Sequence, residues 1–364
     1  MSTMDRSDNF TFKITQLREI LQNRGFEAVE IKTQTNFSYF TRGRGFIGLA
    51  SVMACASLIV TMEKIFLVAE NIEASRLYTE QLDNEPSVVV CEYPWDEPSK
   101  RADLLSDIIG GLKVASEADL DSELFKLRTV MTPYDLNDYR NLCKTTAEIV
   151  EKICMAIKPG ITEYELAGAL SMKLWSANIE PITLLIAFDE RALQYRHPVV
   201  TGKALEHYAL VAVCGRRNGL IASVTRDVML RPDEETVQKH AKCANVFATF
   251  LSELTPGKNL GDIYLEGISS YAEQGYPLEY KAHHQGGLTG FVPREIRANV
   301  GVTHIVRSGE VYAFNPSLQG AKCEETVLVT ESGIEIMTHT GNYQYVECHI
   351  NGNAYMIPTV YRAD

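Results

Sequence analysis

The spacing of hydrophobic residues in the first third of the chain predicts alternating helices and strands. Apolar positions recur with helical spacing over residues 11–23, and short continuous apolar runs follow at residues 28–31 and 88–91. Two further runs, at residues 57–61 and 65–69, are separated by a charged pair and predict a buried β-hairpin. This alternation predicts an α/β domain.

An uncharged stretch at residues 45–62 approaches the length of a membrane-spanning helix. Small and hydroxylated residues interrupt it at Gly48, Ser51, Ser57 and Thr61. Its second half has the strand pattern described above, so we expect it to form part of the hairpin and not a membrane span.

The first domain is expected to end just before a strong helix pattern that begins at Thr132, with Pro133 at the first helical position. The preceding stretch, residues 92–123, is charged and has no regular period. We therefore expect a boundary between residues 125 and 132, and we divide the chain into residues 1–128 and 129–364.

The second domain contains an internal repeat. A helix pattern that begins at Pro133 stops at Pro159-Gly160, and a second helix pattern follows. About 97 residues later the scheme recurs, with a helix led by Pro232 that stops at Pro256-Gly257. The repeat predicts two α/β halves related by a pseudo-two-fold axis, with a ligand cleft between their sheets. Each helix pair is followed by a strand pattern, at residues 210–213 and 311–314.

The composition suits two folded domains without cross-links. The 364 residues are 45% hydrophobic, with a formal net charge of -12 and a pI near 5.3. No basic run is present, so we expect a small-molecule partner and neither nucleic acid nor an anionic membrane. Eight cysteines without a Cys-x-x-Cys pair predict reduced, structural thiols. Residues 1–10 are polar and lack a secretion signal, and we expect a cytoplasmic protein.

Three segments carry a family resemblance. Residues 36–43 read Asn-Phe-Ser-Tyr-Phe-Thr-Arg-Gly, residues 219–226 read Gly-Leu-Ile-Ala-Ser-Val-Thr-Arg, and residues 320–330 read Gly-Ala-Lys-Cys-Glu-Glu-Thr-Val-Leu-Val-Thr. Together with the internal repeat, these segments resemble the creatinase and aminopeptidase P superfamily. The resemblance implies an α/β fold class, with a creatinase-like N-terminal domain followed by a pita-bread C-terminal domain of two pseudo-two-fold halves.

The metallopeptidases of that superfamily hold two divalent ions with two aspartates, one histidine and two glutamates, and a water between the ions is the nucleophile. The resemblance implies that most of these ligands are replaced, and we expect no metal cofactor. The corresponding positions are, in order, Ala212 or Val213, then Ser223, then His284 with His283 as the less favoured alternative, then Asn315, and finally the retained Glu324.

Creatinase resembles these peptidases in fold, and it hydrolyses a C–N bond of a guanidino compound without a metal ion. The resemblance places its histidine base at His197, in the segment Tyr195-Arg196-His197-Pro198. An imidazole with the ordinary pKa of about 6.5 takes a proton from water at neutral pH. We therefore expect His197, His284 and Glu324 to be catalytic; a structural surface histidine is the alternative for His197.

Further polar residues are expected to bind the substrate. Two adjacent histidines on a strand face opposite sides, so one of the pair before Gly286-Gly287 is expected in the cleft and the other behind it. The same alternation applies to Glu324-Glu325, and a buried carboxylate there needs a cationic partner such as Lys322. Internal salt bridges are the alternative for the charged residues. The expected substrate contacts are His283, Arg226, Arg294, Glu295, Asn315 and Ser223.

Three functions are compatible with these residues. The first is a metal-independent, creatinase-like hydrolase or lyase that acts on a C–N bond of a small polar, guanidino or zwitterionic compound, with Glu324 and Glu295 on a cationic group. The second is a non-catalytic binding protein on a degenerate peptidase fold. The third is a metallopeptidase with an atypical ligand set such as His283, His284 and Glu324. By analogy with creatinase-type proteins we also expect a homodimer, with Arg42 or Arg44 contributed to the neighbouring site.

Overall fold

The chain forms two compact units, Met1–Tyr134 and Asp135–Asp364. A computed structural model describes residues 4–231 and 233–363, so Pro232, expected at the start of the second repeat, lies outside the described residues. The sequence pattern places the boundary six residues earlier than these units do, after residue 128. Within the described ranges, no helix combines the length and the apolar character that a bilayer crossing needs.

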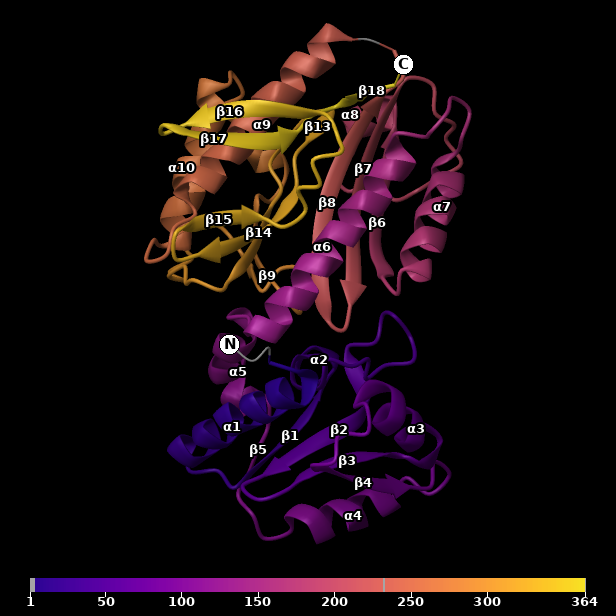
Figure 1. The fold of residues 1–364 in the computed structure, drawn as a ribbon, viewed down its shortest axis with the longest axis vertical. Helices are drawn as coiled ribbons and strands as arrows, with labels where there is room; N and C mark the ends of the chain where they lie inside the picture. Colours follow the sequence, from indigo (N-terminus) through magenta and orange to yellow (C-terminus); the bar gives the residue numbers. More distant parts are fainter. Residues whose placement is uncertain (1–3, 232, 364) are drawn as a thin grey trace. The chain divides into compact units, whose positions relative to one another are not determined.

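The N-terminal unit is built on a five-stranded sheet in the order β4-β3-β2-β1-β5 (Figure 1). Strands β2 and β3 are the predicted antiparallel hairpin, and helices α1 and α2 pack against this sheet. The elements are α1 (Arg6–Arg24), β1 (Ala28–Thr33), α2 (Gln34–Thr41), β2 (Met53–Thr61), β3 (Ile65–Glu70), α3 (Asn71–Arg76), a π-helical turn (Leu77–Gln81), β4 (Val88–Tyr93), α4 (Lys100–Ile109), β5 (Val114–Ala115), a 3-10 turn (Ala118–Leu120) and α5 (Asp121–Thr129).

Two segments of this unit differ from the sequence prediction. Helix α2 is not among the predicted elements; it begins after Thr33, whose hydroxyl accepts a hydrogen bond from the backbone N–H of Asn36 and so caps the helix. Helix α4 lies in the charged stretch for which no regular period was expected, and that expectation is wrong there. Leu104, Leu105, Ile108 and Ile109 recur at helical spacing and are half-buried, which is the apolar stripe of a surface helix.

The C-terminal unit repeats one plan, in which two helices are followed by a mainly antiparallel sheet. The sheets have the orders β18-β8-β7-β6 and β10-β9-β11-β14-β15, and β12-β13 and β16-β17 form two-stranded sheets. The first half contains α6 (Pro133–Cys154), α7 (Glu163–Ser176), β6 (Glu180–Phe188), α8 (Glu190–Gln194), β7 (Tyr208–Arg217) and β8 (Leu220–Met229). The second contains α9 (Glu234–Glu253), α10 (Leu260–Glu273), a 3-10 turn (Glu279–Ala282), β9 (Gly286–Thr289), β10 (Ile296–Arg297), β11 (Val311–Phe314), β12 (Ser317–Leu318), β13 (Ala321–Lys322), β14 (Glu325–Thr330), β15 (Gly333–Ile336), β16 (Tyr345–Ile350), β17 (Asn353–Pro358) and β18 (Tyr361–Arg362).

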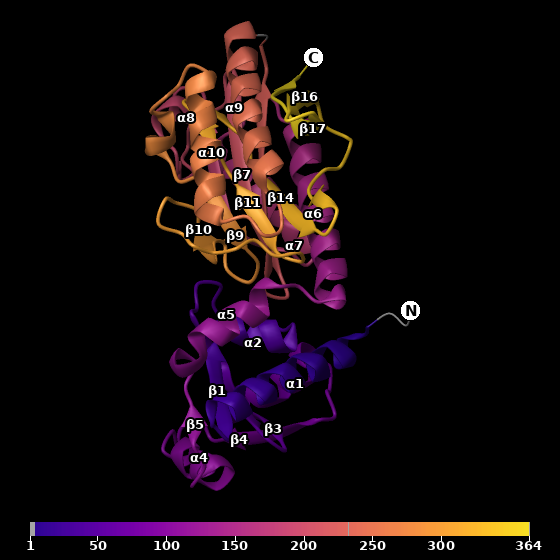
Figure 2. The same ribbon diagram turned by 90° about the vertical axis from the view of Figure 1, so that its left-hand side faces the viewer.

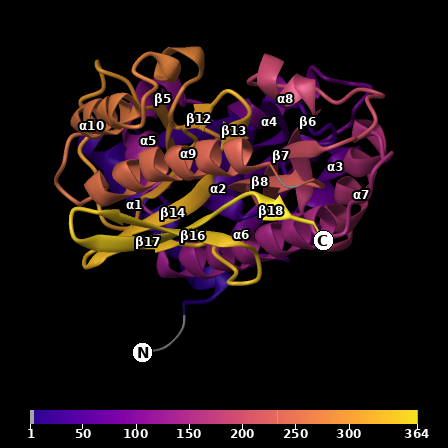
Figure 3. The same cartoon turned by 90° about the horizontal axis from the view of Figure 1, so that it is seen from above.

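The two halves meet along strands β8 and β14. The backbone N–H of Thr225 donates to the carbonyl of Glu324 at 3.0 Å, and the N–H of Ser223 donates to Oγ1 of Thr326 at 2.8 Å. Figure 2 shows α9 and α10 side by side, and Figure 3 shows β16 and β17 against α9. The contact between β8 and β14 brings both predicted site segments, residues 219–226 and 320–330, to one place.

Strand β8 sends alternate side chains to opposite faces. Arg226 lies on the face covered by α6, where its guanidinium bonds to Glu151 at 2.7 Å and also to Glu325. Thr225 lies on the other face, where its hydroxyl donates to Glu324 at 3.0 Å. The adjacent residues Glu324 and Glu325 therefore lie on opposite faces, and of the two only Glu324 is on the face that lines the cavity described next.

Candidate active site

A cavity of about 280 Å³ lies where the two sheets of the C-terminal unit meet. Strands β6 and β7 form one wall, and the segments before β9, at β10 and around β13 supply most of the charged groups. This volume is suited to a small molecule. The lining residues are Thr183, Leu185, His197, Ala212, Cys214, His284, Pro293, Arg294, Arg297, Asn315, Lys322 and Glu324.

Three histidines form a cluster at this cavity. Nε2 of His197 lies 3.0 Å from Nε2 of His283, and the rings of His283 and His284 are stacked with centroids 4.4 Å apart. Of the adjacent pair, His284 lines the cavity and His283 lies behind it, bonded to His197, which is the division expected from the sequence. The expected reason is wrong, because strand β9 begins only at Gly286, the strand alternation does not apply, and both rings lie near His197.

The hydrogen bonding of His284 fixes its tautomer. Its Nδ1 accepts the backbone N–H of Gly286 at 3.2 Å, so in the neutral ring the proton is on Nε2. Burial first, and then the positive charge of Arg294, lowers the pKa of His284 to about 4. The ring is therefore a neutral hydrogen-bond donor at physiological pH.

The other two histidines are also held neutral. Burial, followed by the positive charge of Lys322, lowers the pKa of His283 to about 2. The same two causes lower the pKa of His197 from its ordinary value. One proton therefore lies between the two rings, with one Nε2 as donor and the other as acceptor.

Glu324 is the centre of an ion cluster in the same cavity. One carboxylate oxygen accepts from Arg294 at 2.7 Å, and the other contacts Lys322 at 3.0 Å and accepts from Thr225 at 3.0 Å. The amide of Asn315 is 3.5 Å from the first oxygen. Burial alone raises the pKa of Glu324, but Lys322 and Arg294 outweigh it and lower the pKa to about 2. Glu324 is ionised and its charge is compensated within the protein.

The residues present do not fit a two-metal centre. Ala212 lines the cavity and Val213, the next residue of β7, faces away, so an alanine stands at the first aspartate position. Ser223 lies behind the wall, with its hydroxyl 3.4 Å from the sulfur of Cys214. Asn315 stands where the family has a carboxylate. The remaining carboxylate, Glu324, is already occupied by its ion pairs with Arg294 and Lys322. Among the described residues, the cavity wall therefore has no pair of free carboxylates for hard divalent ions.

The three imidazoles lie close enough to be considered as a metal site. One nitrogen of each lies within 4.8 Å of the others. Two observations oppose metal binding here: Nδ1 of His284 accepts a backbone N–H and leaves a protonated Nε2, and the adjacent Arg294, Arg297 and Lys322 repel a dication. An ion held by His283, His284 and Glu324 is further disfavoured because Glu324 is paired.

Three residues expected to bind the substrate are elsewhere. Arg226 is 1% exposed and bonded to Glu151 and Glu325 on the opposite face of β8, so it does not reach the cavity. Ser223 is fully buried behind Cys214. Glu295 is not part of the cavity wall, and its backbone N–H pairs with Leu288. In contrast, His197, His284, Arg294, Asn315 and Glu324 all line the cavity, and His283 is bonded to His197.

Sequence reasoning missed two parts of this site. Arg297 lines the cavity because β10 pairs with β9 and places Arg297 opposite Gly287, which is a register that the sequence pattern does not reveal. Cys214 lies in the wall as well, but burial raises the pKa of its thiol, and it is held as a neutral thiol. Lys322 was considered only as a partner of Glu324, whereas it is itself part of the lining.

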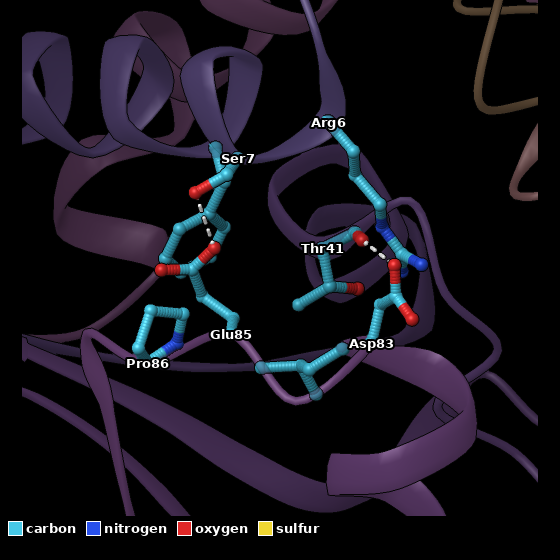
Figure 4. A pocket seen from close by; sticks show the side chains of 8 residues that line it. Arg6, Ser7, Thr41, Asp83, Glu85 and Pro86 are labelled. Atoms are coloured by element: carbon cyan, nitrogen blue, oxygen red, sulfur yellow. Dashed lines mark hydrogen bonds between the residues drawn. The ribbon is translucent and has the colours of Figure 1, made fainter.

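A second hollow, of about 110 Å³, lies in the N-terminal unit (Figure 4). Its polar groups bond to one another: the hydroxyl of Ser7 donates to Glu85 at 2.7 Å, and the guanidinium of Arg6 donates to the carbonyl of Thr41 at 2.9 Å. The second oxygen of Glu85 accepts from the hydroxyl of Ser87 at 2.7 Å. These hydrogen bonds within the protein give the polar residues of the hollow a structural role.

Comparison with known proteins gives the family. Residues 137–331 match the model of metallopeptidase family M24. The chain belongs to this family. It is 23% identical over 350 residues to an uncharacterized peptidase, MW1651, of Staphylococcus aureus strain MW2, covering 90% of this chain and 99% of that one.

Solved structures agree with the M24 fold. The prolidase from Pyrococcus horikoshii OT3 superposes with a TM-score of 0.74 at 18% identity, covering 90% of this chain and 98% of that chain. The N-terminal domain of the FACT complex subunit SPT16 from chickpea superposes with a TM-score of 0.69 at 13% identity, covering 92% and 97%. The predicted creatinase-like, pita-bread fold is thereby confirmed, and membership of a peptidase family supports hydrolysis of a C–N bond.

Proposed function

We propose that this M24 protein hydrolyses a C–N bond of a small polar molecule without the two-metal centre of its family. The observation that carries the proposal is the pair of His197, which lines the cavity, and His283 behind it, whose Nε2 atoms lie 3.0 Å apart. A base oriented by a second group is the arrangement that general-base hydrolysis requires.

His197 is the base in this proposal. When His197 donates its Nε2–H to the neutral His283, Nδ1 of His197 is unprotonated and takes a proton from water. The water oxygen bonds to the carbonyl carbon of the substrate. The proton then passes from His197 to the leaving nitrogen as the C–N bond breaks, so a carboxylic acid and an amine are formed and His197 is regenerated.

His284 is the donor that stabilises the developing oxyanion. Its Nε2–H is set by the hydrogen bond from Gly286 to Nδ1, and the ring stays neutral because its pKa is lowered to about 4. A neutral imidazole donates a hydrogen bond without giving up its proton. Preorganised donors of this kind account for about 10²- to 10³-fold in rate in hydrolases.

The charges of the cavity favour an amide over a guanidino compound. The resemblance to creatinase implies a cationic substrate group on Glu324 and Glu295. Glu324 is instead compensated by Lys322 and Arg294, and Glu295 is outside the wall. A guanidinium would therefore meet positive charge and no free carboxylate.

Activity assays on the purified full chain test this proposal. A library of N-acyl amino acids and dipeptides is screened for amine release, before and after treatment with EDTA and 1,10-phenanthroline, together with elemental analysis for Mn, Fe, Co and Zn. We expect turnover that chelators do not change and that His197→Ala lowers by about 10²- to 10⁴-fold. His349→Ala, at an exposed histidine, is the matched control. Loss of turnover on chelation, restored by a metal ion, would overturn metal independence.

A binding protein without catalysis is the second candidate. It is supported by the likeness to the N-terminal domain of SPT16, which is a subunit of the FACT complex. Binding of a library member without any turnover, and with the same affinity in His197→Ala, would favour this candidate over the hydrolase.

We further propose that the chain forms a homodimer through the loop between α2 and β2. This loop exposes Ile47 (73%) and Val52 (76%), which is apolar surface that self-association would cover. Arg42 is 3% exposed and is thereby a poor candidate for a neighbouring site, which leaves Arg44. Light scattering on Ile47→Asp/Val52→Asp should show a monomer if this loop is the interface, and an unchanged mass would reject it.

A further inference from the structure

The charged side chains of the cavity do not balance. Three cationic side chains, Arg294, Arg297 and Lys322, line it with a single carboxylate, Glu324. The histidines are neutral and add no charge of their own. Two positive charges therefore stay uncompensated at the wall, although the chain as a whole has a formal charge of -12.

Glu324 orients two of these cations but does not use all their donors. It accepts from one nitrogen of Arg294 at 2.7 Å and pairs with Lys322 at 3.0 Å. Nε of Arg294 is buried and has no acceptor among the described residues. The ammonium of Lys322 has three N–H donors, of which Glu324 uses one. An anionic oxygen of a ligand would satisfy the donors that remain.

Arg297 is separate from this cluster. It is exposed at the cavity wall, and within residues 4–231 and 233–363 its guanidinium has no hydrogen bond or ion pair. A guanidinium with five N–H donors and no acceptor in a small cavity is suited to bidentate binding of a second carboxylate.

Asn315 offers the cavity an unpaired acceptor, whereas the cations offer unpaired donors. Its side chain is 3% exposed and lines the cavity, and its Oδ1 has no donor among the described residues. A buried carbonyl oxygen without a partner is costly, and an amide N–H of a ligand would satisfy it. The cavity thus offers two places for anionic oxygens and one for an N–H.

We propose that the site selects a dianionic amide, that is, an N-acyl derivative of a dicarboxylic amino acid. One carboxylate binds Arg294 and Lys322, the second binds Arg297, and the amide N–H donates to Asn315. This inference rests on the proposed function, since it names the substrate class of the same site. Glu324 is not a ligand of the substrate in this arrangement; it is a positioning residue for the two cations that it contacts.

Binding measurements on the inactive His197→Ala chain test this inference without requiring turnover. Calorimetry compares N-acetyl-aspartate and N-acetyl-glutamate with N-acetyl-alanine, which lacks the second carboxylate, and with inorganic phosphate. We expect the dianionic amides to bind at least about tenfold more tightly than N-acetyl-alanine, and the difference to shrink as salt is added.

Variants assign the preference to its residues. Arg297→Gln should remove the difference between the dianionic and the monoanionic amides, while Arg140→Gln, at an exposed ion pair outside the cavity, should retain it. Asn315→Leu should weaken all the amides but not glutarate, which has two carboxylates and no amide N–H. Equal affinity for one and two carboxylates, a preference that survives Arg297→Gln, or tighter binding of phosphate would overturn the inference.

The two proposals fail in different ways. If dianionic amides bind with dependence on Arg297 but none is hydrolysed by the unmodified chain, the substrate class stands and the hydrolase proposal fails. If the unmodified chain hydrolyses neutral or monoanionic amides faster than dianionic ones, the hydrolase stands and the substrate class is wrong.

Discussion

Nε2 of His197 lies 3.0 Å from Nε2 of His283, although 86 residues separate the two in the sequence. This is the hydrogen bond that fixes the ring of His283, because Nδ1 of His283 is buried and has no partner among the described residues. The bond couples a ring that lines the cavity to one held neutral behind it. It thereby determines which nitrogen of His197 is free to accept a proton.

The acid limb of the pH–rate profile should report His197. Burial and the positive charges of Lys322, Arg297 and Arg294 lower its pKa below 6.5, so we expect the limb of kcat/KM below pH 6.5. Removing a positive charge makes protonation easier, so Arg297→Gln should move the limb to higher pH. Arg140→Gln, outside the cavity, should leave it in place. An acid limb at the same pH in Arg297→Gln would show that the group that titrates is not His197.

Local pattern was sufficient for much of the fold. The helix pattern that follows Pro159-Gly160 forms α7, which begins with a capping box of Thr162 and Glu165, and the runs at residues 57–61 and 65–69 pair as β2 and β3. These features depend on neighbours in the sequence. The cavity depends on the register between strands that are far apart, and for this reason Arg297 was missed and Arg226 was assigned to the wrong face.

The resemblance supplied the central site residues, but not their roles. It placed His197 and Glu324, which both line the cavity. The role of Glu324 follows only from the side chains around it, since Lys322 and Arg294 together compensate its charge. Packing between the two halves decides which face of a strand lines the cavity and which charged side chains pair with each other. Neither property leaves a periodic signal in the sequence.

Glu324→Gln should destabilise the fold far more than loss of an exposed carboxylate. Breaking a buried ion pair leaves Lys322 and Arg294 uncompensated, which costs about 3 to 5 kcal/mol. The matched control is Glu335→Gln, since Glu335 also pairs with an arginine, Arg140, but both side chains are at least 40% exposed. There we expect a loss of about 0 to 1 kcal/mol. Urea unfolding of both variants measures the difference, and similar losses would contradict the cluster described for Glu324.

Stability should fall on acidification because His283 is buried in its neutral form. Its pKa is lowered from 6.5 to about 2, so between these values the unfolded chain binds a proton that the folded chain does not. Stability is therefore lost as the pH falls below 6.5, at up to about 1.4 kcal/mol per pH unit for this group. Urea unfolding at pH 7, 6 and 5 measures the slope. His283→Gln should reduce the slope of stability against pH below that of the parent chain. His349→Gln, at an exposed ring, should keep the parent slope. Equal slopes in the two variants would exclude His283 as the cause.

Gly286 has to be glycine because two constraints coincide there. Its φ is +89°, and an added Cβ would lie 2.1 Å from the carbonyl oxygen of Ala313 on the paired strand β11. Gly160 has nearly the same φ, +87°, but nothing lies within 4 Å of the added Cβ. Gly160→Ala should therefore cost only the conformational penalty, about 1 to 2 kcal/mol, and Gly286→Ala should cost about 1 to 3 kcal/mol more because the strands must separate. The backbone N–H of Gly286 also holds Nδ1 of His284, so any folded Gly286→Ala should lose turnover beyond what its stability explains. Turnover measured well below the unfolding temperature decides this: a Gly286→Ala chain as active as Gly160→Ala would show that the position of His284 does not depend on this turn.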